Sequence, residues 1–255
     1  MQLPTNPLPE CYPDQPQSET ATDTCSAAGI ERDPGLCSVR HNGFDTTADN
    51  AIQSFNTTFV VPPLPTSFDS QIMFLSANIR PLDVNGVPFG NLRAALQYGG
   101  SGIAGTGPFW TYALQLEVPG EGFFQITIGG ANITLDVGQR IDSFIVADPA
   151  LAVEFPGDNW YIAGFDNIPD SPTIEVGWEV LPQVVALQLE EEGVSGPSDY
   201  PAGSFVFEQI NLNLTTGPPA ALYWNTSGDP ATDVQVKVDV EGSRDAQVSI
   251  IFPSA

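Results

Sequence analysis

The stretch VVALQLEEEGV, residues 184–194, alternates apolar and polar side chains. In an extended backbone Leu187 and Leu189 lie on one side of the chain, and Gln188 and Glu190 lie on the other. This period of two is typical of a β-strand with one face in a hydrophobic core. The stretch therefore predicts a strand that carries an amide and a carboxylate together on its polar face.

Three more segments repeat the alternation: LRAALQYG (92–99), WTYALQLEV (110–118) and TIEVGWEV (173–180). Their apolar residues oppose positions that include Gln97, Gln115 and Glu117. If the four strands share one sheet, its outer face is a surface of amides and carboxylates with almost no cation on it. That surface is the predicted functional groove.

Further short apolar runs are bounded by Gly, Pro, Asn or Asp and spaced as strands are. They are 54–61, 71–79, 122–130, 131–138, 141–148, 151–157 (LAVEFPG), 160–166, 204–214, 233–242 and 246–252. We expect all of them to be strands, with no convincing helix. Many short strands predict an all-β fold, a concanavalin A-like β-sandwich (jelly roll) of two antiparallel sheets.

The pattern divides the chain into two parts. Residues 1–48 are rich in Pro, Asp, Thr and Cys, show no sustained period, and predict an irregular N-terminal extension. Residues 49–255 predict a single β-sandwich domain, in which 218–255 form a C-terminal hairpin that joins it.

The charge of the chain restricts its partners. Seven basic residues stand against 31 acidic ones, and the formal net charge is -24. Such a surface repels nucleic acids and anionic membranes, so neither is expected to bind. The acidity is either a solubility device of a secreted protein or an adaptation to acid, in which protonated carboxylates leave few like charges.

Cysteines and glycosylation sequons favour an extracellular protein. Cys11, Cys25 and Cys37 predict one disulfide and one odd thiol, with the pairing left open. N-x-S/T sequons occur at Asn56, Asn132, Asn213 and Asn225. MQLPTNPLPE has no apolar signal region, so we expect a mature chain with an added methionine or an export signal outside this sequence. A secreted, monomeric glycoprotein is expected.

Several kinds of chemistry are disfavoured. The single histidine, His41, lies in the irregular segment, and no Gly-x-Ser-x-Gly motif occurs, which argues against serine hydrolases and zinc sites. The glycine-rich loop 99–107 has no lysine and predicts a mobile loop beside the groove. We expect no cofactor and no metal, although Asp158, Asp166 and Asp170 lie in oxygen-rich loops that suit calcium.

Paired carboxylates are the remaining route to acid–base catalysis. Glu190 and Glu192 would lie about 6.5 to 7 Å apart along a strand, closer to the spacing of inverting glycosidases than of retaining ones. Glu175 and Glu179 would lie about 13 Å apart. No tight Glu-x-Asp-x-Glu motif of a polysaccharide hydrolase occurs.

Short motifs resemble the fungal glutamic peptidases, the eqolisins. They are HNGFD with SFNTTFVVPPLP, then ALQYGG, LDVGQRI, LQLEEEG and F-V-F-x-x-I, in that order between about residues 40 and 215. The chain also looks like a broader set of secreted concanavalin-like proteins. It departs from the eqolisins at 74–81, where FLSANIRP replaces a tryptophan-rich strand. It departs again at the aromatic strand, where Leu114 or Gln115 replaces an acidic residue.

The resemblance implies an acid endopeptidase with a Gln/Glu dyad. Gln97 matches the family's catalytic glutamine and Glu190 its glutamate, with Glu191 as the competitor if the register shifts by one. Face alternation favours Glu190. A glutamate among carboxylates suits acid–base catalysis, and a glutamine amide can orient water and stabilise an oxyanion. The expected groove residues are Gln115, Glu117, Gln188, Glu192 and Trp110.

Two alternatives remain open on the same fold. One is a non-catalytic module that binds a glycan or another polymer, with Trp110, Trp160, Trp178 or Trp224 as stacking platforms. Trp178 shares its face with Ile174 and Val176 and is expected in the core. The other is a polysaccharide hydrolase or lyase. The partner is in each case a polypeptide or a glycan.

Overall fold

The computed structural model describes residues 32–40, 50–88, 90–100, 107–118, 122–124, 133–220, 222–228 and 231–254, without the side chains of 32–40, 117–118 and 122–124. All of these residues belong to one compact unit, Glu31–Ala255. Within them no helix is long and apolar enough to cross a membrane.

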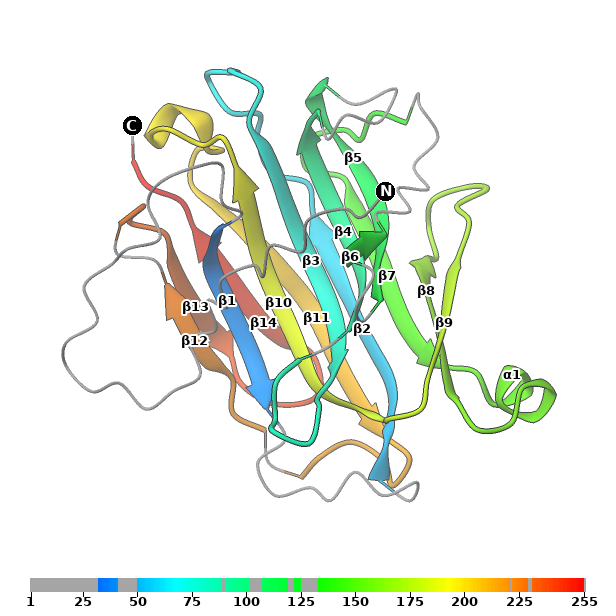
Figure 1. Cartoon of the computed structure of the whole chain (residues 1–255). Helices are drawn as coiled ribbons and strands as arrows, with labels where there is room; N and C mark the ends of the chain where they lie inside the picture. The colour runs from blue at the N-terminus through cyan, green and yellow to red at the C-terminus, as the bar shows by residue number, and fades with distance from the viewer. Residues whose placement is uncertain are drawn as a thin grey trace, which may run out of the picture. The chain divides into compact units, whose positions relative to one another are not determined.

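The described strands form two antiparallel sheets of seven strands each (Figure 1). The first sheet has the order β12 (Asn225–Gly228), β1 (Arg32–Arg40), β10 (Pro182–Glu192), β3 (Ile72–Pro81), β4 (Asn91–Gly99), β5 (Gly107–Val118) and β6 (Gly122–Phe124). The second has the order β13 (Gln235–Val240), β14 (Ala246–Ile251), β11 (Ser204–Leu214), β2 (Ile52–Val60), β7 (Arg140–Ala147), β8 (Asn159–Phe165) and β9 (Ile174–Trp178). The predicted all-β class with two antiparallel sheets is confirmed.

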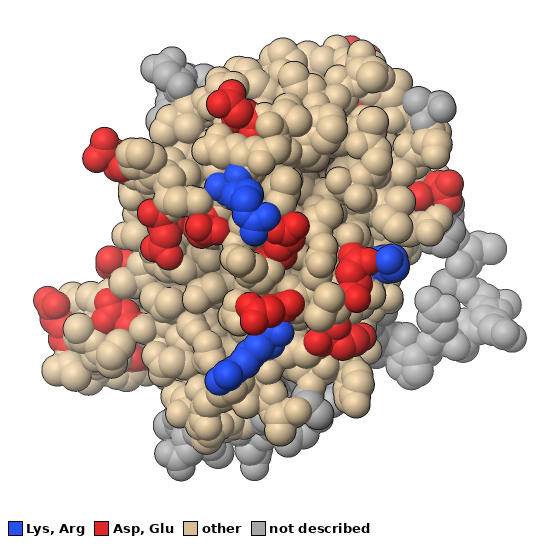
Figure 2. Space-filling view, turned by 180° about the vertical axis from the view of Figure 1, so that it is seen from behind, with Lys and Arg blue, Asp and Glu red and all other residues tan. Residues whose placement is uncertain are grey.

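Basic side chains of the second sheet lie beside acidic ones. Arg140 forms an ion pair with Glu208, and Lys237 forms one with Asp239. Figure 2, seen from behind the view of Figure 1, shows blue side chains next to red ones on a largely uncharged surface. Pairing of this kind is worth little at an exposed position, about 1 kcal/mol or less, so these contacts do not decide the fold.

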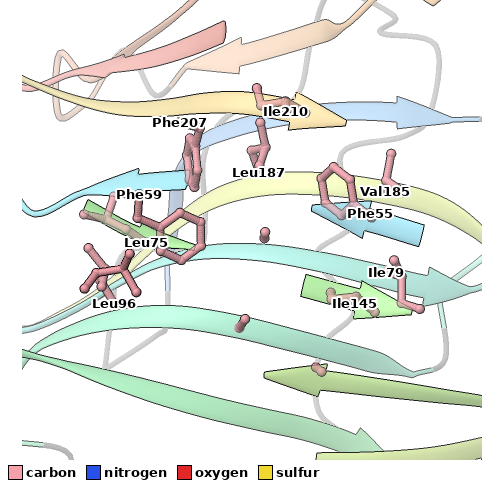
Figure 3. Packing of buried hydrophobic residues seen from close by; sticks show 14 of the residues in the cluster. Phe55, Phe59, Leu75, Ile79, Leu96, Ile145, Val185, Leu187, Phe207 and Ile210 are labelled. Carbon is pink, nitrogen blue, oxygen red and sulfur yellow. The ribbon is translucent and has the colours of Figure 1, made fainter. Parts of the chain in front are cut away.

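The hydrophobic core fills the space between the two sheets (Figure 3). Leu75, Leu96 and Leu187 come from the first sheet, and Phe59 and Phe207 come from the second. The Phe59 ring is fully buried and packs edge-on against Phe207, with ring centroids 5.3 Å apart. The alternate residues of each strand supply this core because successive side chains point to opposite sides.

Three predicted elements are wrong. The described part of the predicted strand 131–138, residues 133–138, is irregular and ends in a turn. The segment 151–157 is not a strand: Pro149–Glu154 form the short helix α1. Asp148 caps it by accepting hydrogen bonds from the backbone N–H groups of Ala150 and Leu151, and Pro149 has the fixed φ that suits a first helical position. This capping signal outweighs the apolar character of the run.

The third error concerns the N-terminal extension of 1–48, which is not irregular throughout. Strand β1 lies within it and pairs with β10 on one side and β12 on the other. Pro34 and Gly35 are residue types that rarely occur inside strands, so the sequence pattern does not indicate this one. The pairing with β10 is irregular between Arg32 and Gly35. Its partners lie far along the chain, so no local pattern announces them. The C-terminal hairpin of β13 and β14 joins the second sheet through β11.

A buried carboxylate fastens two loops near one end of the first sheet. Asp199 ends the short helix η2 (Pro197–Asp199) and is 4% exposed. It accepts hydrogen bonds from Ser67, from the Ser195 hydroxyl and backbone, and from the Gly196 backbone. Burial alone raises the pKa of Asp199, but these hydrogen bonds to its charged form hold the pKa below the usual range.

Truncating Phe59 to Ala is expected to lower the free energy of unfolding by about 3–5 kcal/mol, because it leaves a cavity among packed rings. Denaturant unfolding followed by tryptophan fluorescence measures the change. Tyr223, which is 75% exposed, gives the control: Tyr223→Ala should change the free energy by about 0.5 kcal/mol or less. Equal losses in the two variants would contradict the placement of Phe59.

The buried, hydrogen-bonded Asp199 carboxylate should make the free energy of unfolding depend on pH. Its folded-state pKa is lowered, so its contribution is complete above its unfolded pKa of about 3.9 and is lost as pH falls through the folded value. Asp199→Asn should cost about 1.5–3 kcal/mol at neutral pH. The gap between the variant and the wild type should narrow below pH 4 in urea unfolding. A gap that stays constant from pH 7 to pH 2 contradicts this role.

Candidate functional site

Four adjacent strands of the first sheet, β10, β3, β4 and β5, carry polar side chains on the side turned away from the core. Leu187 on β10 and Leu75 on β3 lie in the core, so the residues between such positions face the other way. We call this side the polar face. Its polar members include Ser76, Asn78, Arg80, Asn91, Arg93, Gln97, Thr111, Gln115, Gln188, Glu190 and Glu192.

Gln97 and Glu190 lie at the same level of the polar face. Both pair in register with Phe74 of β3, which stands between them. We call this set of paired positions the Phe74 row. Because neighbouring strands are about 4.8 Å apart, the two Cα atoms are separated by about 9.6 Å. The row thus places an amide and a carboxylate on either side of one phenyl ring.

The Glu190 carboxylate is held by two neighbours. Its Oε2 forms an ion pair with Arg93 of β4, and its Oε1 accepts a 2.8 Å hydrogen bond from Nε2 of Gln188. The carboxylate and the guanidinium are both almost fully buried, with side-chain exposures of 5% and 2%. A buried ion pair is retained only when further hydrogen bonds satisfy it, and Gln188 supplies one.

Arg93 reaches Glu190 by crossing β3. In register it pairs with Asn78, which lies four residues along β3 from Phe74. The guanidinium carbon of Arg93 nevertheless lies 5.8 Å from the centre of the Phe74 ring. The row between contains Ser76 and Ala95, whose small side chains leave room for the arginine. Guanidinium over a ring face is a favourable cation–π arrangement.

A second arginine extends the set. Arg80 of β3 donates from Nε to the Asn78 side chain at 3.0 Å and from Nη2 to Oε1 of Gln188. Asn78 also donates to Oε1 of Gln188, at 3.2 Å. The polar face therefore holds a continuous chain of contacts from Arg80 through Gln188 and Glu190 to Arg93. We call these four residues, with Asn78, the arginine–glutamate network.

Sequence reasoning missed part of this network: Gln188 and Glu190 were expected on the polar face, but Asn78 and Arg80 were not recognised. A polar face almost without cations was expected, and that expectation is wrong because Arg80 and Arg93 both lie on it. Ser76, Asn78 and Arg80 were hidden in a run that looks continuously apolar. Their spacing of two residues is the signal that identifies the polar side of β3.

The other predicted groove residues occupy different positions. Gln188 contacts Glu190 directly. Gln115 lies on the polar face, pairs in register with Arg93, and is 2% exposed with no hydrogen bond to its Oε1. Glu192 is exposed at the end of β10. The backbone of Glu117 pairs with Asn91, but its side chain lies outside the described residues.

Trp110 is not a groove residue. It is fully buried on the core side of β5, packs against Tyr98 at 5.3 Å between ring centres, and donates to the Pro63 carbonyl at 3.4 Å. Trp110 and Gln115 are five residues apart on β5. Side chains separated by an odd number of residues point to opposite sides of a strand. Among the other tryptophans, Trp178 and Trp224 also lie in the core.

Glu175 does not join the polar face. Strand β9, which carries it, belongs to the second sheet, so the fourth strand with the predicted alternation is separated from the other three. Glu175 and Glu179 are exposed there. No group of three or more His, Cys, Asp or Glu side chains able to hold a metal ion occurs among the described residues, and Asp158, Asp166 and Asp170 are not brought together.

Other predicted features lie wholly or partly outside the described residues. They are His41, the sequon at Asn132, the loop segment 101–106, and two of the cysteines, Cys11 and Cys25. Of the remaining sequons, Asn225 is exposed, whereas Asn56 and Asn213 are half-buried within strands of the second sheet. Among these three described sequons, Asn225 is the most exposed.

Comparison with known proteins gives a match in structure but none in sequence. No protein-family model and no curated protein matches the chain. The chain resembles a solved eqolisin. That structure is SCP-B, a member of the eqolisin family of peptidases, in a complex with the tripeptide Ala-Ile-His. The TM-score is 0.47 at 10% identity, and the match covers 88% of this chain and 100% of SCP-B. At this identity it says nothing of the side chains on the polar face.

Breaking the buried ion pair should be costly. Arg93→Met leaves Glu190 without its cation and is expected to destabilise the fold by about 3–5 kcal/mol. Adding Glu190→Met to the same chain should recover most of that loss, because apolar side chains of similar volume replace such a pair at little cost. Chemical denaturation of the two variants measures both steps. If the double variant is no more stable than Arg93→Met, the pair does not bind as described.

Proposed function

We propose that the chain is a glutamic-type acid endopeptidase in which Glu190 is the general base and acid and Gln97 stabilises the oxyanion. The Phe74 row supports this best, because it holds one carboxylate and one amide at the same level of one face. The pair needs no metal, no histidine and no cofactor. The proposed substrate is a polypeptide, and the acidic, sequon-bearing chain suits an extracellular setting.

The chemistry begins with a water molecule held between the two side chains. Its oxygen attacks the carbonyl carbon of a peptide bond while its proton passes to the Glu190 carboxylate. The carbonyl oxygen becomes an oxyanion that accepts a hydrogen bond from the Gln97 amide. Glu190 then gives the proton to the amide nitrogen, the C–N bond breaks with its electron pair on nitrogen, and an acid and an amine leave.

Glu190 keeps acceptor capacity for this task. An ionised carboxylate has about four lone-pair sites, and Arg93 and Gln188 each contact one oxygen. The Gln97 amide nitrogen donates to the Gly99 carbonyl at 3.3 Å. Gln97 is fully buried and Glu190 is 4% exposed. Hydrolysis therefore requires the polar face to open to the substrate.

A non-catalytic binding module is the second candidate. The ion pair between Arg93 and Glu190 favours it, because a carboxylate bonded to a cation and an amide is fixed as a structural element. On this proposal the polar face binds a polymer through its amides and arginines and cleaves nothing. Trp110, Trp178 and Trp224 are buried and cannot serve as stacking platforms. Trp160 is half-buried, but its strand β8 belongs to the second sheet and not to the polar face.

Two substitutions test the peptidase. With a denatured protein as substrate at pH 3 to 4, Glu190→Gln should lower kcat/KM by about 10²–10⁴-fold, since it removes the proton acceptor. Gln97→Ala should lower it by about 10²–10³-fold, the usual loss for one oxyanion donor. Mass spectrometry of the released peptides measures the rates.

Glu175→Gln is the matched control, because it removes an exposed carboxylate from the other sheet and should leave the rate unchanged. A wild-type protein that cleaves nothing between pH 2 and 6, or an undiminished Glu190→Gln variant, rules the peptidase out. Saturable polymer binding without cleavage would then support the second candidate.

A further inference from the structure

Arg80 differs from the other described cations in what it contacts. Arg93, Arg140 and Lys237 each pair with a carboxylate, and Arg244 is exposed to water. Arg80 is half-buried, and its partners in the described structure are the neutral side chains of Asn78 and Gln188. Its charge is therefore the one in this set that neither a carboxylate nor full hydration compensates.

The two side-chain amides that contact Arg80 do not use all the N–H donors of its guanidinium. A guanidinium has five N–H donors, and the contacts with Asn78 and Gln188 use two N–H groups. Gln188 connects Arg80 to Glu190, because its side-chain oxygen accepts a hydrogen bond from Arg80 while its side-chain nitrogen donates one to Glu190. Two arginines and one glutamate in this network give it an excess of one formal positive charge, in a chain whose formal charge is -24.

A carboxylate is the group that this arrangement fits. Arginine binds carboxylates in a bidentate manner, and such charge-assisted bonds are roughly twice as strong as neutral ones. A polyanion would be repelled by the strongly acidic protein, whereas a single carboxylate gains short-range contacts with little long-range cost. Glu192, the other acidic side chain described on the polar face, pairs with Ile72, whereas Arg80 pairs with Val184. Eight residues, or about 26 Å, separate these levels.

The distance to the Phe74 row sets where the carboxylate would lie on a substrate. The Arg80 guanidinium reaches Gln188, which is two residues, or about 6.7 Å, from Glu190 along β10. An extended peptide advances about 3.3 Å per residue. The carboxylate would therefore belong to a residue within about two to three positions of the cleaved bond.

We propose that Arg80 is a specificity residue that binds an aspartate or glutamate side chain of a polypeptide ligand on the polar face. The proposal rests on the proposed function, because it names the substrate class of the same site. It can be separated from that function, since binding of an acidic side chain is measurable whether or not a bond is cleaved.

The test compares two fluorescein-labelled alanine peptides that differ in one central residue, glutamate or glutamine. Binding to the full chain is measured by fluorescence anisotropy at pH 5.5, where a free glutamate is ionised because its pKa is about 4.3. Wild-type protein should bind the glutamate peptide about tenfold more tightly. Arg80→Gln should abolish the difference, and Arg80→Lys should keep part of it.

Arg244→Gln is the matched control, because it removes the same charge from an exposed position and should preserve the tenfold ratio. Thermal unfolding confirms that each variant is folded. Equal binding of the two peptides by the wild type, or binding of neither, overturns the proposal. So does an unchanged ratio in Arg80→Gln, or Arg80-dependent binding of an oligogalacturonate in place of the peptide.

The same protein samples separate this inference from hydrolysis. An Arg80-dependent preference without any cleavage supports the acidic-ligand site and contradicts the peptidase. Cleavage that depends on Glu190 but shows no preference for nearby acidic residues supports the peptidase and contradicts the role of Arg80. Mapping the bonds cleaved at pH 5.5, where glutamate side chains of the substrate are ionised, in wild type and Arg80→Gln distinguishes the two results.

Discussion

The two-sided burial of the first sheet is the constraint that organises this structure. Every residue of β4 is buried, on the core side and on the polar side alike. An apolar core satisfies the first side, but buried polar groups must find partners within the protein. The arginine–glutamate network answers that requirement, since each of its five members bonds to another. The fold and the candidate site are consequences of the same alternation of side chains.

Much of the fold can be predicted from this alternation. Leu187 and Leu189 are in the core, and Gln188 and Glu190 bond to each other on the other side. The sequence pattern loses its power where the partner lies far away. Strand β1 depends on β10 and β12, which follow it by well over a hundred residues. Helix α1 depends on a single capping aspartate that a hydrophobic pattern ignores.

The candidate site could be predicted only in part. Period two places Gln97, Gln115 and Glu190 on polar sides of their strands, but it does not state which strands are neighbours. The order β10, β3, β4 inserts Phe74 between Gln97 and Glu190. It also brings Arg93 within reach of Glu190. Both facts come from strand order, a property of the whole sheet that local residue patterns do not encode.

Phe74 also determines the shape of what the site can hold. Between the carboxylate of Glu190 and the amide of Gln97 lies a phenyl ring with the planar guanidinium of Arg93 near its face. The Arg93 guanidinium is a flat group that lies near this aromatic ring while it contacts the Glu190 carboxylate. A peptide group has the same flatness and the same donor. On the proposed function, the Arg93 side chain and the backbone of a bound peptide would therefore compete for the same face of the Phe74 ring.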